Sequence, residues 1–193
     1  MTRIIDRKIW GLTGGIGSGK SVVSRILKEK YGFKIIDADL LTEETYTCVH
    51  HDLENAFGKS IFDLQGKVIR RQLSQCVFGH PDQLAKLNAI MHPAMTSLVR
   101  HKLTQSKNNV ILDAALLFEV GWDSLVQKTI VVVSPTAVRI KRICKRDCVS
   151  PEVARMRIQA QMTDGERVRR ADVMIYNILD ISSLERQCKH IVE

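Results

Sequence analysis

The sequence predicts an α/β fold, a three-layer sandwich in which helices cover both faces of a parallel sheet of about five strands. Short apolar runs recur along the 193 residues and alternate with longer helical patterns, which is typical of such a sheet. A glycine-rich loop also lies between the first apolar run and the first helical pattern. With 45 % hydrophobic and 26 % charged residues, the chain can bury one good core with appended lobes.

The loop Gly14–Ser21 fits the pattern G-x-x-x-x-G-K-[ST]. It follows the apolar run 9–13, which reads as a strand, and precedes a helical pattern over 22–30. Its glycines let backbone N–H groups turn toward a phosphate chain, and the helix N-terminus carries partial positive charge. The pattern predicts a phosphate-binding loop and a fold of the P-loop NTPase type, with Lys20 on the β- and γ-phosphates and Ser21 on Mg²⁺. A glycine-rich turn without a ligand is the alternative.

Carboxylates close two of the predicted strands. The short strand 33–36 ends in Asp37-Ala38-Asp39, and the strand 109–112 ends in Asp113. Ligands of open α/β sheets bind at the carboxyl ends of strands. Asp39 can take a proton from an attacking hydroxyl or hold a metal, or it can simply cap a helix over 40–50. Asp113 resembles the Walker B carboxylate that supports Mg²⁺ through water, or it is a strand end that caps the next turn.

The segment 53–101 is mostly helical and forms a long insertion between strands. Arg70 and Arg71 begin a helix that runs to Phe78; Arg70 is either a solvated charge or an anion clamp. The pair His92-Pro93 is expected to end one helix and start another. A lone histidine at such a position is more often structural than catalytic. Asp63-Leu64-Gln65-Gly66 reads as a turn.

The last part of the chain contains two strands and several basic helices. Strands are expected at 129–133 and 173–176, and Ser134-Pro135 and Ser150-Pro151 each open a helix. The basic residues between them, Arg139, Lys141, Arg142, Lys145 and Arg146, suit a lid that closes on a transferring phosphoryl group, or a nucleic-acid face. Few aromatic residues lie among these charges, which favours the lid. An amphipathic helix ends the chain.

Composition restricts the partners, the redox state and the cellular location that we expect for the chain. The net charge of +8 suits a polyanionic partner, either nucleic acid or a phosphorylated substrate. The five cysteines include no CxxC pair, so we expect reduced thiols and neither a disulfide framework nor a zinc site. The N-terminal residues lack the apolar core of a signal peptide, and no run approaches the length of a membrane span. A cytoplasmic protein without a membrane partner is expected.

Six short sequence motifs resemble, in order and spacing, those of the dephospho-CoA kinase family. They are Gly11–Ser21, Ile36–Asp39, Leu87–Pro93, Leu116–Glu119, Lys145–Asp147 and Ala171–Ile175. The resemblance covers about residues 9–180 and implies transfer of the ATP γ-phosphoryl group to the ribose 3′-hydroxyl of dephospho-CoA, with Mg²⁺. Val22 stands where the family usually has threonine, and Ile178-Leu179 where it usually has glycine.

The loop pattern and the resemblance together imply roles for individual residues. Asp39, Lys20 and Arg146 would be catalytic, and Ser21 would hold the metal, with Asp113 acting indirectly. The nucleotide would contact Gly15, Gly17, Ser18, Gly19, Lys20, Ser21, Val22, Arg146 and Asn177. The acceptor would contact Asp39, Arg70, His92, Leu117 and Glu119.

The resemblance also implies a layout for one P-loop kinase domain over residues 1–193. Its core would comprise about 1–41, 102–135 and 171–193, with an acceptor-binding helical insertion over 42–101 and a lid over 136–170. The expected state is a monomer that acts on a small molecule and not on nucleic acid. A kinase for another small acceptor, such as a nucleoside monophosphate, and a nucleic-acid-binding NTPase are the alternatives.

Overall fold

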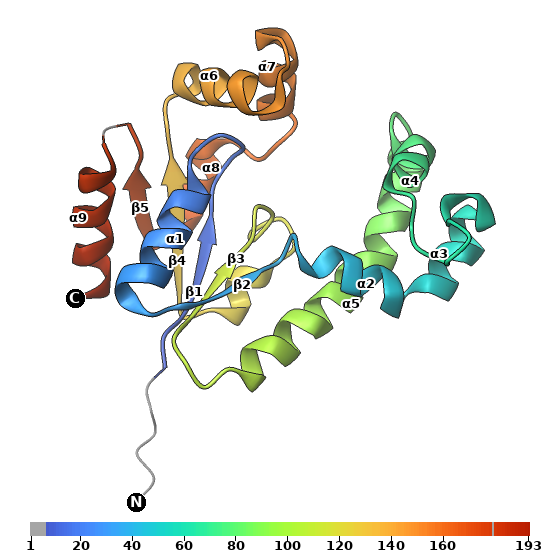
Figure 1. Cartoon of the computed structure of the whole chain (residues 1–193), viewed down its shortest axis with the longest axis horizontal. Helices are drawn as coiled ribbons and strands as arrows, with labels where there is room; N and C mark the ends of the chain where they lie inside the picture. Colours follow the sequence, from blue (N-terminus) through green and yellow to red (C-terminus); the bar gives the residue numbers. More distant parts are fainter. Residues whose placement is uncertain (1–6, 179) are drawn as a thin grey trace, which may run out of the picture. The chain divides into compact units, whose positions relative to one another are not determined.

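The computed structural model describes residues 7–178 and 180–193. These residues form a five-stranded sheet with the order β2-β3-β1-β4-β5, and every neighbouring pair is parallel (Figure 1). The predicted parallel sheet of about five strands is therefore confirmed. The strands are β1 (Ile9–Thr13), β2 (Lys34–Asp37), β3 (Val110–Asp113), β4 (Lys128–Val133) and β5 (Val173–Tyr176).

Helices connect these strands. The α-helices are α1 (Lys20–Tyr31), α2 (Leu41–Cys48), α3 (His50–Phe57), α4 (Arg70–Val77), α5 (Pro81–Gln105), α6 (Thr136–Asp147), α7 (Pro151–Gln159), α8 (Asp164–Arg170) and α9 (Ile181–Val192). Two short 3₁₀ helices, η1 (Lys59–Ile61) and η2 (Trp122–Leu125), lie between them. Chain contacts divide the protein into a helical unit, Ala38–Lys102, and a sheet unit made of the remaining residues.

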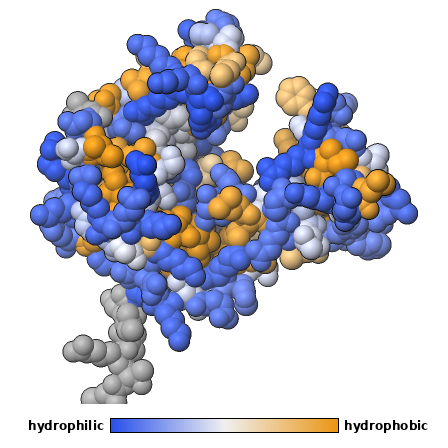
Figure 2. All heavy atoms as spheres, in the orientation of Figure 1, coloured by the Kyte–Doolittle hydropathy of each residue, from blue (hydrophilic) through white to orange (hydrophobic). Residues whose placement is uncertain are grey.

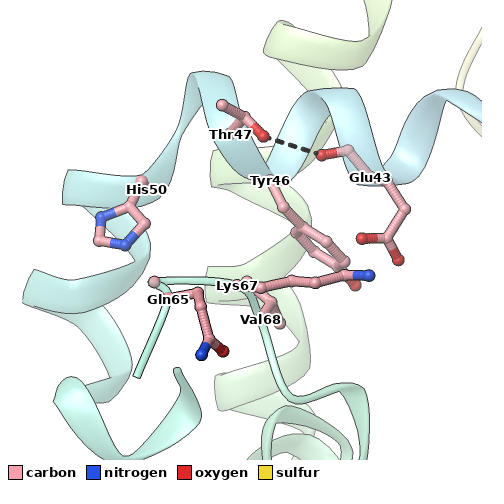
Figure 3. A pocket seen from close by; sticks show the side chains of 8 residues that line it. Glu43, Tyr46, Thr47, His50, Gln65, Lys67 and Val68 are labelled. Atoms are coloured by element: carbon pink, nitrogen blue, oxygen red, sulfur yellow. Dashed lines mark hydrogen bonds between the residues drawn. The ribbon is translucent and has the colours of Figure 1, made fainter. Parts of the chain in front are cut away.

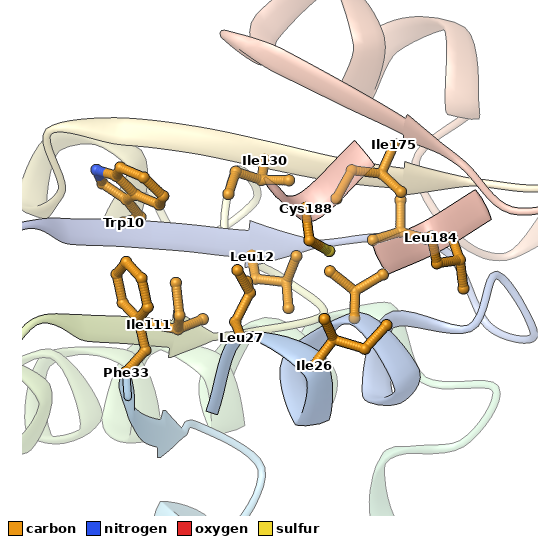
Figure 4. Close-up of a cluster of buried hydrophobic side chains, with 12 residues drawn as sticks. Trp10, Leu12, Ile26, Leu27, Phe33, Ile111, Ile130, Ile175, Leu184 and Cys188 are labelled. Atoms are coloured by element: carbon orange, nitrogen blue, oxygen red, sulfur yellow. The ribbon is translucent and has the colours of Figure 1, made fainter. Parts of the chain in front are cut away.

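The sheet unit has its main apolar core between the sheet and helices α1 and α9 (Figure 4). Strand side chains alternate between faces, so Trp10 and Leu12 share the face that α1 covers. On the other face, a Cβ at Gly11 would meet Leu117, so the segment after β3 covers the sheet there. The core residues are Trp10, Leu12, Val23, Ile26, Leu27, Phe33, Ile111, Ile130, Val132, Ile175, Leu184 and Cys188.

The helical unit has a separate core. Residues from α3, η1, α4 and α5, from the turn before α4 and from the junction of α2 and α3 contribute to it, namely Val49, Leu53, Ile61, Val68, Leu73 and Met91. The predicted turn at 63–66 is present, because the Asp63 carboxylate accepts hydrogen bonds from the N–H groups of Gln65 (2.9 Å) and Lys67 (2.8 Å). An isolated antiparallel bridge joins Phe62 and Val68 across this turn.

The prediction that His92-Pro93 separates two helices is wrong, because α5 runs without interruption through Pro93. Proline removes one backbone hydrogen bond from a helix and crowds the preceding turn. Buried side chains on both sides of the proline, Met91 and Val99, hold the helix in place across it, and the Thr96 hydroxyl donates to the His92 carbonyl (2.7 Å). Packing of the flanking side chains therefore outweighs the tendency of Pro93 to end the helix.

The start of α6 differs in detail from the sequence prediction. Pro135, not Ser134, is the N-cap residue, and the helix begins at Thr136. The Ser134 hydroxyl instead donates to the carbonyl of Asn177 (2.7 Å), which lies just after β5. Ser150 caps α7 as predicted, with Pro151 at the first helical position.

None of the helices in the described part of the chain is long and apolar enough to span a membrane. Hydrophilic residues cover most of the face seen in Figure 2. Exposed apolar side chains occur singly or in small groups, as with Val153 and Met156 on α7.

The Asp172 carboxylate, just before β5, is hydrogen-bonded to Thr129 of β4, and this contact predicts how the stability of the fold depends on pH. The Asp172 carboxylate accepts hydrogen bonds from both the N–H and the hydroxyl of Thr129, each at 2.7 Å. These bonds hold the pKa of Asp172 below its ordinary value of 3.8. The stabilisation is thus present at neutral pH and is lost as the pH falls through the lowered pKa.

We therefore expect Asp172→Asn, which keeps an acceptor oxygen, to flatten the acid side of the stability curve. Between about pH 6 and about pH 3, Tm should fall less in the variant than in the parent. The difference between the two falls should be a few degrees at most, because Asp172 is exposed. Parallel curves for the two proteins would show that this carboxylate does not contribute.

Candidate active site

The glycine-rich loop leads from β1 into α1. Gly17 (φ +77°) and Gly19 (φ +92°) adopt the left-handed backbone conformation that side chains disfavour, which explains glycine at both positions. The Ser18 N–H donates to the Gly15 carbonyl (3.0 Å), which closes a turn at the tip of the loop. Gly19 is the N-cap of α1 without a side-chain cap, so Lys20, Ser21 and Val22 form the first turn of the helix. The free N–H groups at such a helix N-terminus stabilise a bound anion.

Lys20 and Asp113 meet at the carboxyl ends of two neighbouring strands. Leu12 of β1 pairs in register with Asp113 at the end of β3, so this carboxylate lies beside the strand that leads into the loop. The Lys20 ammonium group forms an ion pair with Asp113, whose side chain is 6 % exposed. The two predictions from separate motifs, the loop lysine and the strand-end carboxylate, therefore fall on side chains in direct contact.

Arg139 of α6 fixes the tip of the loop from outside. Its side chain is buried, its Nε donates to the Ile16 carbonyl (2.8 Å), and its Nη1 donates to Asp164 of α8 (2.8 Å). A Cβ at Gly15 would clash with the Arg139 guanidinium group, which explains glycine there. Arg139 thus links the loop to both α6 and α8.

Arg142 and Asn177 bind the next two carbonyls of the loop. Arg142 Nη1 donates to the Gly17 and Ser18 carbonyls (3.2 Å each), and Asn177 Nδ2 donates to the Ser18 carbonyl (2.7 Å). Arg142 Nη2 also donates to Asn177 Oδ1 (3.3 Å). These bonds orient the peptide groups of the loop through their oxygens, so they do not occupy the N–H groups that a phosphate chain needs.

The Ile16 N–H is held by Gln161, which lies between α7 and α8. Its Oε1 accepts this hydrogen bond at 2.8 Å. Together with Arg139 on the carbonyl, Gln161 fixes the two peptide groups that flank the Ile16 Cα. The segment 136–170 is therefore attached to the phosphate-binding loop at Ile16, Gly17 and Ser18.

Removing the Gln161 acceptor should loosen the loop and weaken nucleotide binding. We expect Gln161→Leu to raise the Kd for ATP about five- to tenfold, the effect of about one hydrogen bond, as measured by calorimetric titration. Gln159→Leu is the matched control, because Gln159 is exposed at the end of α7. Equal affinities for the two variants would contradict a role for Gln161 in holding the loop.

Arg146 lies at the end of α6 and contacts its neighbours rather than the loop. Its Nε and Nη2 donate to the Asp147 carboxylate (2.6 and 3.1 Å), and Arg157 of α7 donates to the same carboxylate (2.6 Å). The hydrogen bonds from Arg146 lower the pKa of Asp147, and the bond to Asp147 raises that of Arg146. Arg139, Arg142 and Arg146 are spaced by three and four residues, so they share a helix face. Of the three, Arg146 alone has a site role predicted from the sequence, and this spacing could have added the two arginines that bind the loop.

Glu119 and Leu117 lie in the segment after β3. The Glu119 carboxylate accepts a hydrogen bond from Arg167 of α8 (3.2 Å), and the Arg167 side chain is fully buried. Arg167 also donates to the Met162 carbonyl (2.5 Å). The Leu117 side chain is buried against Gly11 of β1. Glu119 thus contacts α8 through Arg167, and Leu117 belongs to the core.

The remaining predicted residues belong to the helical unit. Asp39 is exposed in the turn before α2, two residues beyond the end of β2. Arg70, at the start of α4, forms an ion pair with Glu43 of α2 (Nη2–Oε1 2.6 Å). His92 lies within α5, where burial lowers its pKa.

A pocket of about 420 Å³ opens beside Glu43 on the helical unit (Figure 3). Tyr46, Thr47 and His50 line it from α2 and α3, and Gln65–Val68 line it from the turn before α4. Burial raises the pKa of Tyr46, opposed by the nearby Arg70 charge. No pattern in the sequence pointed to this pocket, because the turn that closes it is brought to α2 only by folding.

Comparison with known proteins shows the family of this chain. The family model described as dephospho-CoA kinase matches residues 8–182. A dephospho-CoA kinase from Carboxydothermus hydrogenoformans is 40 % identical, covering 96 % of this chain and 93 % of its own length, and one from Fusobacterium nucleatum is 37 % identical, covering 96 % and 97 %. The crystal structure of TT1252 from Thermus thermophilus is 32 % identical, with a TM-score of 0.84 over 96 % of both chains.

Proposed function

This chain belongs to the dephospho-CoA kinase family and is an ATP-dependent kinase, and we propose that it transfers the γ-phosphoryl group of ATP to the ribose 3′-hydroxyl of dephospho-CoA. The observation that supports this most strongly is the loop itself. Its glycines have the backbone geometry of a phosphate cradle, and its lysine contacts a strand-end carboxylate. The reaction is expected in the cytoplasm, and its products are CoA and ADP.

The proposed mechanism depends on positioning the two substrates and on neutralising charge, because phosphoryl transfer requires no covalent bond to the protein. Lys20 and the N–H groups at the start of α1 would bind the β- and γ-phosphates and stabilise the charge that develops on the transferring group. Asp39 would orient the acceptor hydroxyl and accept its proton late in the transfer. The chain reaches Asp39 directly from the end of β2, whose last residue, Asp37, pairs in register with Asp113.

Arg146 would add positive charge at the transferring phosphoryl group from the proposed lid, residues 136–170. For this it has to leave the Asp147 carboxylate, to which it is now hydrogen-bonded. Arg157 is bound to the same carboxylate, so Asp147 would keep a cationic partner after the exchange. The side chain of Arg146 is 62 % exposed, which leaves it free to reorient.

The residues beside Lys20 fit a magnesium ion. Mg²⁺ prefers oxygen ligands and is usually held by one or two protein groups together with substrate phosphates and water. The Ser21 hydroxyl lies in the first turn of α1. The Asp113 carboxylate lies at the end of β3, the strand that pairs with β1. Asp113 is bound to Lys20, so a triphosphate that attracts Lys20 would release the carboxylate for the metal shell. When bound, the ion would neutralise charge on the β- and γ-phosphates.

An ADP-release assay with a panel of acceptors tests the proposal. We expect release to depend on dephospho-CoA and to remain at background with nucleoside monophosphates. Faster turnover of a nucleoside monophosphate would favour the first alternative. ADP release that is stimulated by DNA or RNA and falls steeply with salt would favour a nucleic-acid-dependent NTPase.

A further inference from the structure

We infer that the pocket on the helical unit binds the pantetheine arm of the acceptor, an inference that rests on the proposed function. The pocket lies beside α2 and has a volume within the range of small-molecule sites. Its polar lining comes from Glu43, Tyr46, Thr47, His50, Gln65 and Lys67. None of these residues belongs to the phosphate-binding loop or to the sites predicted from the sequence.

The position of the pocket along α2 is the first argument. The Thr42 N–H donates to the Asp39 carbonyl (3.4 Å), so near-helical geometry extends back to Asp39. Glu43, Tyr46 and Thr47 follow Asp39 by four, seven and eight residues, the spacing that places side chains on one face of a helix. With a rise of about 1.5 Å per residue, they lie about 6 to 12 Å further along the axis.

This separation suits the part of the acceptor that lies beyond its ribose. If the ribose hydroxyl is presented at Asp39, the 5′-diphosphate lies close to it and the pantetheine arm continues beyond the diphosphate. An arm that follows α2 from Asp39 would enter the pocket between Glu43 and His50. The pocket, Asp39 and Arg70 all lie within the helical unit, so this path does not depend on any other part of the chain.

The chemistry of the lining is the second argument. The arm is uncharged and carries amide groups, a hydroxyl, methyl groups and a terminal thiol. The pocket offers hydroxyls from Tyr46 and Thr47, an amide from Gln65 and methyl groups from Val68, which match a chain of alternating donors, acceptors and apolar groups. Figure 3 shows Lys67 extending alongside Tyr46 toward Glu43.

The charges of the lining argue against the diphosphate as its occupant. Glu43 lines the pocket and would repel phosphate oxygens, and Arg70 already forms an ion pair with it at 2.6 Å. Lys67 is the cation among the lining residues and Glu43 is the anion, so the lining itself carries charges of both signs. Together with its hydroxyl and amide groups, such a lining suits an uncharged polar chain.

A pair of bulky substitutions on α2 tests whether the acceptor enters the pocket. Thr47→Trp narrows the pocket, and Cys48→Trp adds the same bulk at the next residue, which is also exposed and does not line it. We expect Thr47→Trp to raise KM for dephospho-CoA about tenfold, with kcat and KM for ATP within about twofold of the parent. Cys48→Trp should leave all three within about twofold. Equal KM values for dephospho-CoA in the two variants would overturn the inference.

Covalent trapping identifies which end of the acceptor lies there. In Thr47→Cys/Cys48→Ser, the introduced thiolate would attack the mixed disulfide of dephospho-CoA and mercaptoethanol. The new bond joins the protein sulfur to the dephospho-CoA sulfur, and mercaptoethanol leaves as its thiolate. Peptide mass spectrometry would measure the adduct at residue 47 and at the exposed native Cys148.

We expect the adduct at residue 47 to form about tenfold faster than at Cys148, after both rates are normalised to those with the disulfide of mercaptoethanol alone. Equal normalised rates would show that the thiol end lies elsewhere and would overturn the assignment of the arm. Trapping reports binding alone. Failure of the proposed function would be seen separately, as the absence of ADP release by the parent protein with dephospho-CoA.

Discussion

Lys20→Ala is expected to lower kcat by about 10³-fold while the fold is retained, because the ammonium group at the start of α1 would no longer neutralise charge on the transferring phosphoryl group. The effect should appear in kcat more than in KM for ATP, since this charge develops in the transition state. Initial rates of ADP release at saturating dephospho-CoA measure it directly.

Lys28→Ala is the matched control for this substitution. Lys28 is exposed on the same helix, so its removal changes the net charge equally and does not touch the loop. Circular dichroism of both variants would check the fold, because Lys20→Ala leaves the buried Asp113 without the ion pair that it now has. A kcat for Lys20→Ala within about tenfold of the parent would remove Lys20 from the catalytic role.

Asp39→Asn is expected to lower kcat by about 10²- to 10⁴-fold, the range for loss of a general base. The amide has the shape of the carboxylate but cannot accept the proton of the acceptor hydroxyl. KM for ATP should stay within about twofold of the parent, because Asp39 is proposed to act on the acceptor only. Steady-state kinetics with each substrate varied in turn separate these effects.

Asp52→Asn serves as the control for Asp39→Asn, since Asp52 is an exposed carboxylate of α3 in the same helical unit. Near-normal turnover of purified Asp39→Asn would assign proton acceptance to another group. A parallel rise in KM for ATP would instead indicate that Asp39 acts on the nucleotide side of the site.

The sheet and the loop could be predicted from the sequence because their signals are local. Each strand is a short apolar run, and the loop is a fixed spacing of glycines that positive φ angles at Gly17 and Gly19 require. The continuation of α5 through Pro93 could not be predicted in this way. It depends on the burial of Met91 and Val99, and that burial is set by residues distant in sequence.

The partners of the arginines illustrate the same limit. Helical spacing places Arg139, Arg142 and Arg146 on one face of α6, but it does not show how far along the helix the loop lies. The structure places the loop against Arg139 and Arg142 and leaves Arg146 on Asp147. Glu119 likewise contacts Arg167, which is 48 residues away and carried no motif of its own.

The position of the new phosphate in the product is the most direct test of the proposed reaction. After complete turnover of dephospho-CoA and ATP, phosphorus NMR of the purified product should show one added phosphomonoester, coupled to the ribose 3′ proton, and the diphosphate unchanged. A phosphate at the 2′-hydroxyl or on the pantetheine arm would contradict the account, as would ADP formed with free phosphate and no phosphorylated acceptor.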